Sequence, residues 1–163
     1  MVDSEKSTEI VFMAGVPGAG KTTLAKERYG EEGYKFIEFH LRPTADFVPE
    51  LDMICGDTIE LLERMEREVW DNAESPRWVF DGSEIPTSVL IDLVRKSRRV
   101  GYHTTVVYVL VNPEVAIERN KDRPAETKVH PADIRRGAAY AENAIDMLKT
   151  YAHEVEVVDN RSK

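Results

Sequence analysis

The sequence predicts an α/β fold in which a parallel sheet of about five strands carries helices on both faces. Short apolar runs alternate with longer stretches whose apolar residues recur at helical spacing. The clearest run, 104–111, holds eight mostly β-branched or apolar residues, which is the composition of a strand buried on both faces. A second apolar run, 10–14, leads directly into a glycine-rich loop and then a helix.

The composition is that of an ordinary globular protein. The chain has 163 residues, of which 42% are hydrophobic and 32% are charged. This predicts one domain, 1–163, with a sizeable core, and excludes collagen-like and disordered classes. The single Cys55 excludes an internal disulfide and a thiolate zinc site. The sequence contains no apolar stretch of about 18 residues, so no membrane span is predicted. Residues 1–9 lack a secretory signal pattern. We therefore expect a cytoplasmic protein.

The first half of the chain predicts four elements. Residues 10–14 form a strand, and a helix over 21–29 follows the loop, with Gly30 as its stop signal. A second strand is expected at 36–39. Between 49 and about 72, apolar residues recur at helical spacing among charged ones, which predicts a long amphipathic helix.

The next three elements continue the alternation. A third short strand is expected at 78–80, stopped by the pair Asp81 and Gly82. Residues 86–97 show helical spacing of their apolar side chains, and 104–111 form the fourth strand.

Proline and asparagine mark the last elements. Asn112 is expected to cap a helix that has Pro113 at its first position and ends before Pro124. One last helix is expected to begin at Pro131, and residues 155–158 can add a fifth strand.

The strongest motif is the segment 15–22, which matches G-x-x-x-x-G-K-[ST] in full. Its glycines let backbone N–H groups ring the phosphates of a nucleoside triphosphate, and the following helix adds its positive end. Lys21 places a charge near the β- and γ-phosphates, and Thr22 offers a hydroxyl to Mg²⁺. The residues expected to contact the nucleotide are Gly15, Gly18, Ala19, Gly20, Lys21, Thr22 and Thr23.

The second half of the chain narrows the class of nucleotide-binding protein. A GTPase of this type is expected to carry N-K-x-D, but Asn120, Lys121 and Asp122 follow one another without the intervening residue. Motor ATPases are usually longer. Residues 114–136, and in particular 118–123 and 128–135, resemble the lid region of the kinase domain of phage polynucleotide 5′-hydroxyl kinase and related small P-loop kinases. The zeta-toxin kinases share the general layout. Together with segment 15–22, the likeness covers most of residues 10–150. It implies a P-loop kinase fold, ATP as donor, and a lid near 119–131.

The resemblance implies roles for two arginines. Arg123 would be a lid arginine that reaches the ATP phosphates, with Arg119 assisting from one helical turn earlier. A guanidinium stabilises the charge that spreads over the transferring phosphoryl group. The alternative is a solvated helix face, on which both arginines pair with Glu118 and Asp122.

Asp81 is expected at the carboxyl edge of the sheet, which faces the ligand crevice of such folds. In the kinases that the chain resembles, an acid here contacts the acceptor or organises the waters of the magnesium ion. The alternative is a turn aspartate before Gly82.

The catalytic base is the least defined part of the prediction. The family usually shows an Asp near the end of the second strand with an Arg three residues later, but Phe39 stands three residues before Arg42. The candidates are Asp46, which has the right chemical type, then His40, whose ordinary pKa suits base work, and then Glu38. Arg42 is a candidate for holding an anionic group on the acceptor.

For the acceptor, the lid likeness favours a polynucleotide or nucleotide 5′-hydroxyl. The net charge of −8 favours a nucleotide sugar or another small metabolite instead. A third possibility is a regulatory module that binds nucleotide without transferring phosphate, because the expected base pattern is broken. We interpret the basic cluster at 95–99 as cations at a helix C-terminus rather than a nucleic-acid grip.

Overall fold

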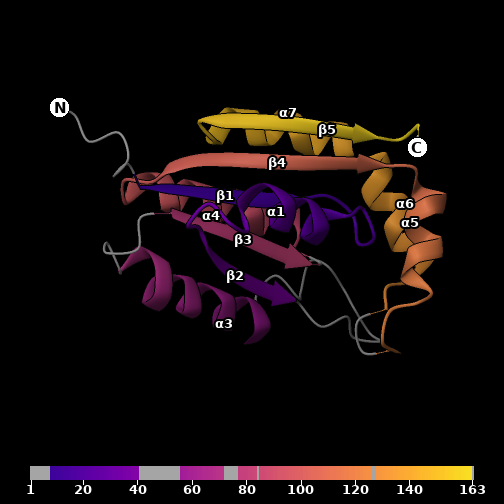
Figure 1. Ribbon diagram of the computed structural model, residues 1–163, viewed down its shortest axis with the longest axis horizontal. Helices are drawn as coiled ribbons and strands as arrows, with labels where there is room; N and C mark the ends of the chain where they lie inside the picture. Colours follow the sequence, from indigo (N-terminus) through magenta and orange to yellow (C-terminus); the bar gives the residue numbers. More distant parts are fainter. Residues whose placement is uncertain (1–7, 41–55, 72–76, 84, 126–127, 163) are drawn as a thin grey trace.

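The computed structural model describes residues 8–40, 56–71, 77–83, 85–125 and 128–162. Five strands form one sheet in the order β2-β3-β1-β4-β5, and every neighbouring pair is parallel (Figure 1). The strands are β1 (Glu9–Ala14), β2 (Lys35–His40), β3 (Arg77–Ser83), β4 (His103–Val111) and β5 (Glu154–Asn160). The helices are α1 (Lys21–Tyr29), α3 (Gly56–Met65), the π-helical turn η2 (Glu66–Trp70), α4 (Thr87–Arg99), α5 (Pro113–Asn120), α6 (Pro131–Ala139) and α7 (Ala141–Tyr151).

Helices cover both faces of the sheet, as predicted, and α1 and α7 lie on opposite sides of it (Figure 1). Side chains alternate along β1, so Ile10 and Phe12 pack with α3, α4 and α7, while Val11 and Met13 pack with α1. All four of these β1 side chains are buried. The apolar run of this strand is therefore explained by its position in the middle of the sheet.

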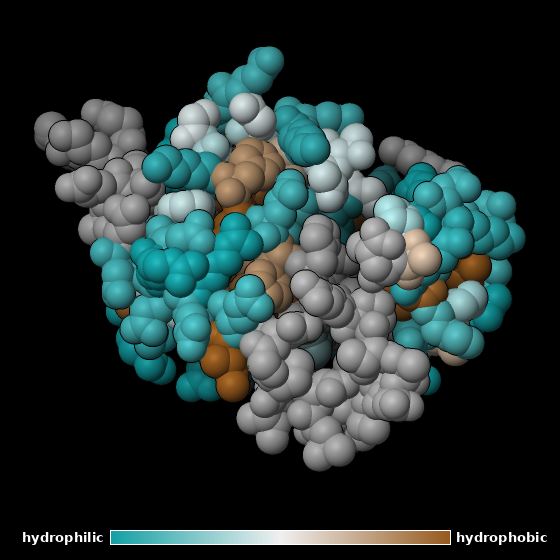
Figure 2. Space-filling view, turned by 90° about the horizontal axis from the view of Figure 1, so that it is seen from below, coloured by the Kyte–Doolittle hydropathy of each residue, from teal (hydrophilic) through white to brown (hydrophobic). Residues whose placement is uncertain are grey.

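The face seen from below is largely hydrophilic where its residues are described (Figure 2). The view from below, over the side that carries α3, shows hydrophilic side chains with only small hydrophobic patches between them (Figure 2). No helix in the described ranges is both long and apolar enough to cross a membrane.

The predicted end of the third strand was wrong. We expected Asp81 and Gly82 to stop it, but β3 continues to Ser83 and pairs Gly82 with Phe39 of β2. Gly82 is a paired strand residue, and its lack of a side chain leaves room for Phe80, because a Cβ here would lie 2.5 Å from a carbon of that ring. Asp81 thus lies inside a paired strand rather than in a turn.

The single helix expected from Pro131 is two helices, α6 and α7, which meet at Tyr140. Hydrogen bonds continue through the junction, from Tyr140 N to Arg136 O and from Ala144 N to Tyr140 O, so the chain bends without a break. The reason lies in the packing: Ile134 of α6 joins the cluster on the α1 face, whereas Ile145 of α7 joins the opposite one. One straight helix cannot supply both.

The remaining elements agree with the prediction to within a few residues. The long amphipathic helix is confirmed from Gly56 to Trp70, while the predicted start at 49–55 lies outside the described residues. Asn112 caps α5, since its Oδ1 accepts the N–H of Glu114, and Pro113 is the first helical residue. Because all strands are parallel, their carboxyl ends meet at one edge, and the glycine-rich loop after β1 lies there.

Candidate active site

The segment 15–22, called the P-loop below, adopts a backbone that only glycine tolerates at three points. The φ angles of Gly15, Gly18 and Gly20 are 136°, 85° and 96°. A Cβ on Gly15 would lie 2.6 Å from the carbonyl oxygen of Val109, and one on Gly18 would lie 2.7 Å from that of Ala116. The P-loop therefore sits directly on β4 and α5, with no room for side chains at these contacts.

Lys21 is the first residue of α1 and is buried. Its Nζ donates to the carbonyl oxygens of Gly15 at 2.6 Å and Val16 at 3.2 Å. The ammonium group is thus folded back over the P-loop, at the positive end of α1, where both charges favour an anion. Ala19, within the P-loop, is buried, and Thr23 is exposed next to Thr22.

Thr22 and Asp81 meet across two neighbouring elements. The hydroxyl of Thr22 donates to Asp81 Oδ2 at 2.6 Å, although the two residues are far apart in the sequence. Asp81 is 3% exposed, and its strand lies between β1 and β2, so its carboxylate is held in a fixed place. A hydroxyl and a carboxylate are hard oxygen donors that suit Mg²⁺, which takes few protein ligands and completes its shell with water and phosphate. In the described ranges no group of three or more His, Cys, Asp or Glu side chains could bind a metal by itself.

The two candidate arginines lie at the end of α5. Arg119 Nη1 donates to the carbonyl oxygen of Gly18 at 2.9 Å, which places its guanidinium on the P-loop. Arg123 is half-buried in the turn after α5, where its N–H donates to Asn120 O at 3.1 Å. Arg119, the residue to which the sequence assigned the assisting role, therefore contacts the P-loop directly.

Asn120 is a residue that sequence reasoning missed. It is 5% exposed; its Nδ2 donates to Val129 O at 2.6 Å, and its Oδ1 accepts the N–H of Val129 at 3.1 Å. These two hydrogen bonds join the end of α5 to the residue two positions before α6, and so they fix both ends of the connection between the helices. They also anchor the residue next to Arg119. A polar residue at the buried position of the α5 stripe was the only signal in the sequence.

The candidate bases are only partly described. His40 ends β2, paired with Ser83; its side chain, like Asp46 and Arg42, lies outside the described residues. Glu38 is exposed on β2, and its backbone oxygen accepts Arg64 Nη1 at 2.7 Å. The basic cluster at 95–99 lies at the opposite end of the sheet from the P-loop, since α4 ends where β4 begins.

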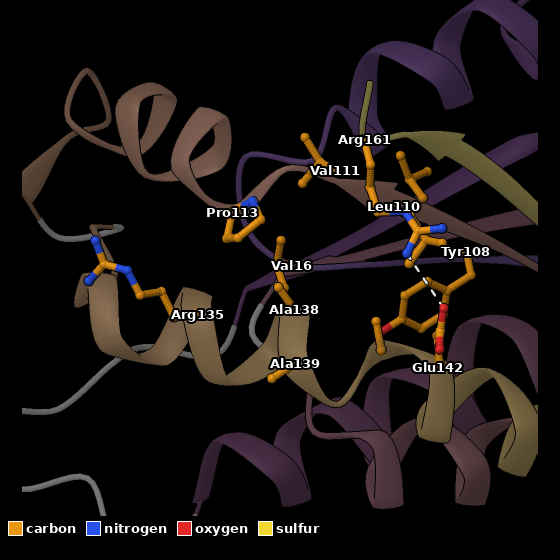
Figure 3. Close-up of a pocket in the computed structure, with 12 residues that line it drawn as sticks. Val16, Tyr108, Leu110, Val111, Pro113, Arg135, Ala138, Ala139, Glu142 and Arg161 are labelled. Atoms are coloured by element: carbon orange, nitrogen blue, oxygen red, sulfur yellow. Dashed lines mark hydrogen bonds and ion pairs between the residues drawn. The ribbon is translucent and has the colours of Figure 1, made fainter. Parts of the chain in front are cut away.

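A separate cavity of about 390 Å³ lies between α6, α7 and the end of β4 (Figure 3). Val16 of the P-loop lines it, and α6 packs so closely that a Cβ on Gly137 would lie 2.8 Å from Val16 Cγ1. Burial raises the pKa of Tyr108, which forms one wall. Arg161 at its rim pairs with Glu142 at 3.5 Å. Most of its lining side chains are aliphatic, and its two arginines are already paired with carboxylates, Arg135 with Glu114 and Arg161 with Asp159.

No protein-family model matches the chain, and no curated protein is significantly similar to it. Solved structures are similar in fold. Deoxyadenosine kinase from M. mycoides with bound dATP is 17% identical, over 92% of this chain and 90% of that one, with a TM-score of 0.58. Kti12 from Chaetomium thermophilum in complex with ADP-AlF3 is 13% identical, over 92% and 88%, with a TM-score of 0.60. Shikimate kinase from Bacteroides thetaiotaomicron is 22% identical, over 90% and 85%, with a TM-score of 0.51. The chain therefore has the fold of the P-loop kinases.

Proposed function

We propose that this protein transfers the γ-phosphate of ATP to a hydroxyl group of an acceptor, with Mg²⁺ as cofactor. The observation that carries the proposal is the convergence of three groups on one P-loop: the buried ammonium of Lys21, the Thr22–Asp81 pair, and the guanidinium of Arg119. A binding module needs the first of these. The hydroxyl–carboxylate pair beside it can hold Mg²⁺, and an arginine on the P-loop is the additional group that stabilises the charge of phosphoryl transfer.

Each group has a distinct task in this proposal. The backbone N–H groups of the P-loop and Lys21 bind the β- and γ-phosphates. Thr22 and Asp81 hold the magnesium ion, which supplies charge neutralisation at the phosphate oxygens. Arg119 stabilises the charge of the transition state from the P-loop side, and Arg123 from the turn after α5.

Among acceptors, the lid likeness favours a nucleotide or polynucleotide 5′-hydroxyl. One observation favours a small acceptor, such as a nucleotide, a nucleotide sugar or another metabolite, over a polynucleotide. Arg95 lies over the ring of Tyr151 at 5.4 Å and Lys96 over that of Trp70 at 5.4 Å, at the far end of the sheet. These cations are used in packing there, so they do not serve a nucleic-acid strand whose end reaches the P-loop. The nucleoside kinase among the fold neighbours supports a small acceptor as well.

The test is transfer of label from γ-labelled ATP, in the presence of Mg²⁺, to a panel of acceptors. The panel holds a 5′-hydroxyl oligonucleotide, free nucleosides, nucleoside monophosphates and a nucleotide sugar, with Lys21→Ala as the blank. We expect label on at least one acceptor with the native protein and none with the variant. Label on the oligonucleotide alone identifies a polynucleotide kinase, and label on a small molecule alone identifies a metabolite kinase. If the native protein binds ATP but labels no acceptor, the protein is a nucleotide-binding module and the proposal fails.

A further inference from the structure

Glu38 and Asp81 are neighbours across the sheet. In the parallel register, the Cα of Glu38 on β2 pairs with that of Asp81 on β3, which pairs in turn with Met13 on β1. Residues paired in this way point to the same face, and neighbouring strands lie about 4.8 Å apart. The side chain of Glu38 therefore emerges beside that of Asp81.

The flanking residues identify the face. Phe36 and Val79, two positions before Glu38 and Asp81, pack in the cluster that contains α1. Ile37 and Phe80 pack in the opposite cluster. Because side chains alternate along a strand, Glu38 and Asp81 share the α1 face, from which Thr22 reaches Asp81.

The two carboxylates have different surroundings. Asp81 is 3% exposed and accepts the Thr22 hydroxyl, so it is committed to the metal-binding pair. Glu38 is exposed, and within the described part of the chain no hydrogen bond or ion pair engages its carboxylate. Arg64 instead holds its backbone oxygen, which fixes β2 against α3. Two neighbouring carboxylates in unlike environments are suited to different tasks.

We propose that Glu38 is the catalytic base that activates the acceptor hydroxyl; this inference rests on the phosphotransfer proposed above. A Glu38 carboxylate oxygen accepts the hydroxyl proton while the hydroxyl oxygen forms a bond to the γ-phosphorus. The bond from that phosphorus to the β–γ bridging oxygen breaks, and its electron pair leaves with ADP. The protonated carboxyl then returns its proton to water.

The experiment compares Glu38→Gln, Glu38→Asp and native protein with γ-labelled ATP and the best acceptor of the panel above. Affinity for ADP with Mg²⁺ is measured separately by calorimetry. The matched control is Glu60→Gln, the same change at an exposed position of α3. His40→Asn and Asp46→Asn test the other candidate bases.

We expect Glu38→Gln to lower kcat by about 10²-fold or more, the usual contribution of a general base. Affinity for ADP, the KM for ATP and the melting temperature stay at native values, Glu38→Asp keeps part of the activity, and Glu60→Gln keeps all of it. The inference is overturned if Glu38→Gln transfers at the native rate, or if its kcat falls only in parallel with ADP affinity. If Glu38→Gln keeps the native rate while His40→Asn or Asp46→Asn loses most of its kcat, the base is His40 or Asp46 and not Glu38. A native protein that labels no acceptor removes both proposals, whereas an active native protein with an equally active Glu38→Gln removes this one alone.

Discussion

The two ends of the parallel sheet use positive charge in opposite ways. At the carboxyl end, Lys21 is buried and donates to backbone oxygens of the P-loop, at the helix N-terminus, which favours an anion. At the amino end, cations lie over aromatic rings: Arg77 over Tyr34 at 4.6 Å and Lys96 over Trp70 at 5.4 Å. Such contacts contribute about 0.5–1 kcal/mol at exposed sites and need no ligand. Under the proposed function, burial of a charge marks the binding site in this protein, whereas the number of charges does not.

The comparison also explains where glycine is required. At the carboxyl end the positive φ angles of Gly15 and Gly18 coincide with backbone atoms closer than 3 Å to a Cβ. Away from the site, Gly33 and Gly101 have positive φ angles in open space. The first kind of glycine is needed for the close packing of the P-loop and the second only for a turn.

The largest effect is expected for Asp81→Asn. The amide keeps the size of the side chain and can still accept the Thr22 hydroxyl, but it loses the charge that would face the proposed magnesium ion. We expect kcat to fall by about 10²–10³-fold, with a higher Mg²⁺ concentration at half-maximal rate. Steady-state rates over a magnesium titration measure both quantities. The control is Asp92→Asn, at an exposed position of α4. If Asp81→Asn kept the native kcat and the native Mg²⁺ concentration at half-maximal rate, Asp81 would not be a ligand of the metal.

Gly18→Ala separates a steric requirement from a conformational one. Gly18 has φ of 85° and a Cβ there would lie 2.7 Å from Ala116 O, whereas Gly33 has a similar φ of 83° with nothing within 4 Å. Both alanine variants carry the backbone strain, about 1–3 kcal/mol, but only Gly18→Ala must also push α5 from the P-loop. We expect Gly18→Ala to lose more unfolding free energy than Gly33→Ala and to lose ATP affinity, both measured by urea denaturation and calorimetry. If the two variants lost the same unfolding free energy, α5 would be able to shift away from the P-loop at no measurable cost in stability.

A smaller effect concerns pH and lies at the amino end. His153 Nδ1 accepts the N–H of Thr104 at 3.0 Å, which requires an unprotonated nitrogen. Burial, followed by the charges of Arg98 and His103, lowers the pKa of His153 below its ordinary value of 6.5. The unfolded chain therefore binds this proton more readily than the folded one, so the stability is complete above pH 6.5 and declines as the pH falls through the lowered pKa.

The free energy of unfolding should thus fall between pH 7 and pH 5, and urea denaturation at each pH measures it. His153→Gln should show a shallower dependence, while the transfer rate relative to the folded fraction stays native, because the histidine is remote from the P-loop. A pH dependence as steep as that of the native protein in His153→Gln would mean that other groups cause it.

The smallest effect is expected for the triple change of Arg95, Lys96 and Arg99 to Gln. These side chains belong to the last two turns of α4, where cations are favoured by the helix dipole. The KM for every acceptor, including an oligonucleotide, should change by less than about twofold, because screening over more than a Debye length of about 10 Å weakens their influence on the P-loop. A marked rise in the oligonucleotide KM alone would show that a strand runs along the molecule to this end.

Local sequence patterns predicted the parts of the fold that depend on neighbouring residues. The P-loop, the cap at Asn112 and the run of β4 were all visible, because each needs only adjacent residues of the right type. Asp81 was identified for a related reason, since the carboxyl ends of parallel strands share one edge.

The features that escaped the sequence depend on contacts between distant segments. The side-by-side position of Glu38 and Asp81 follows from β2 lying next to β3, and strand order is not written in any single strand. The bend at Tyr140 follows from α6 and α7 packing on different faces. The Asn120 clamp requires that Val129 return to α5, which no local pattern indicates.

The central claim is that the P-loop binds the phosphates of ATP through the buried ammonium of Lys21. Calorimetric titration with ATP and Mg²⁺ of the native protein, Lys21→Ala and Lys26→Ala tests it most directly, because Lys26 is an exposed lysine of the same helix. We predict native affinity for Lys26→Ala and a loss of about 10²-fold or more for Lys21→Ala, since a buried charge partner is removed. Equal affinity of Lys21→Ala and native protein would contradict the account.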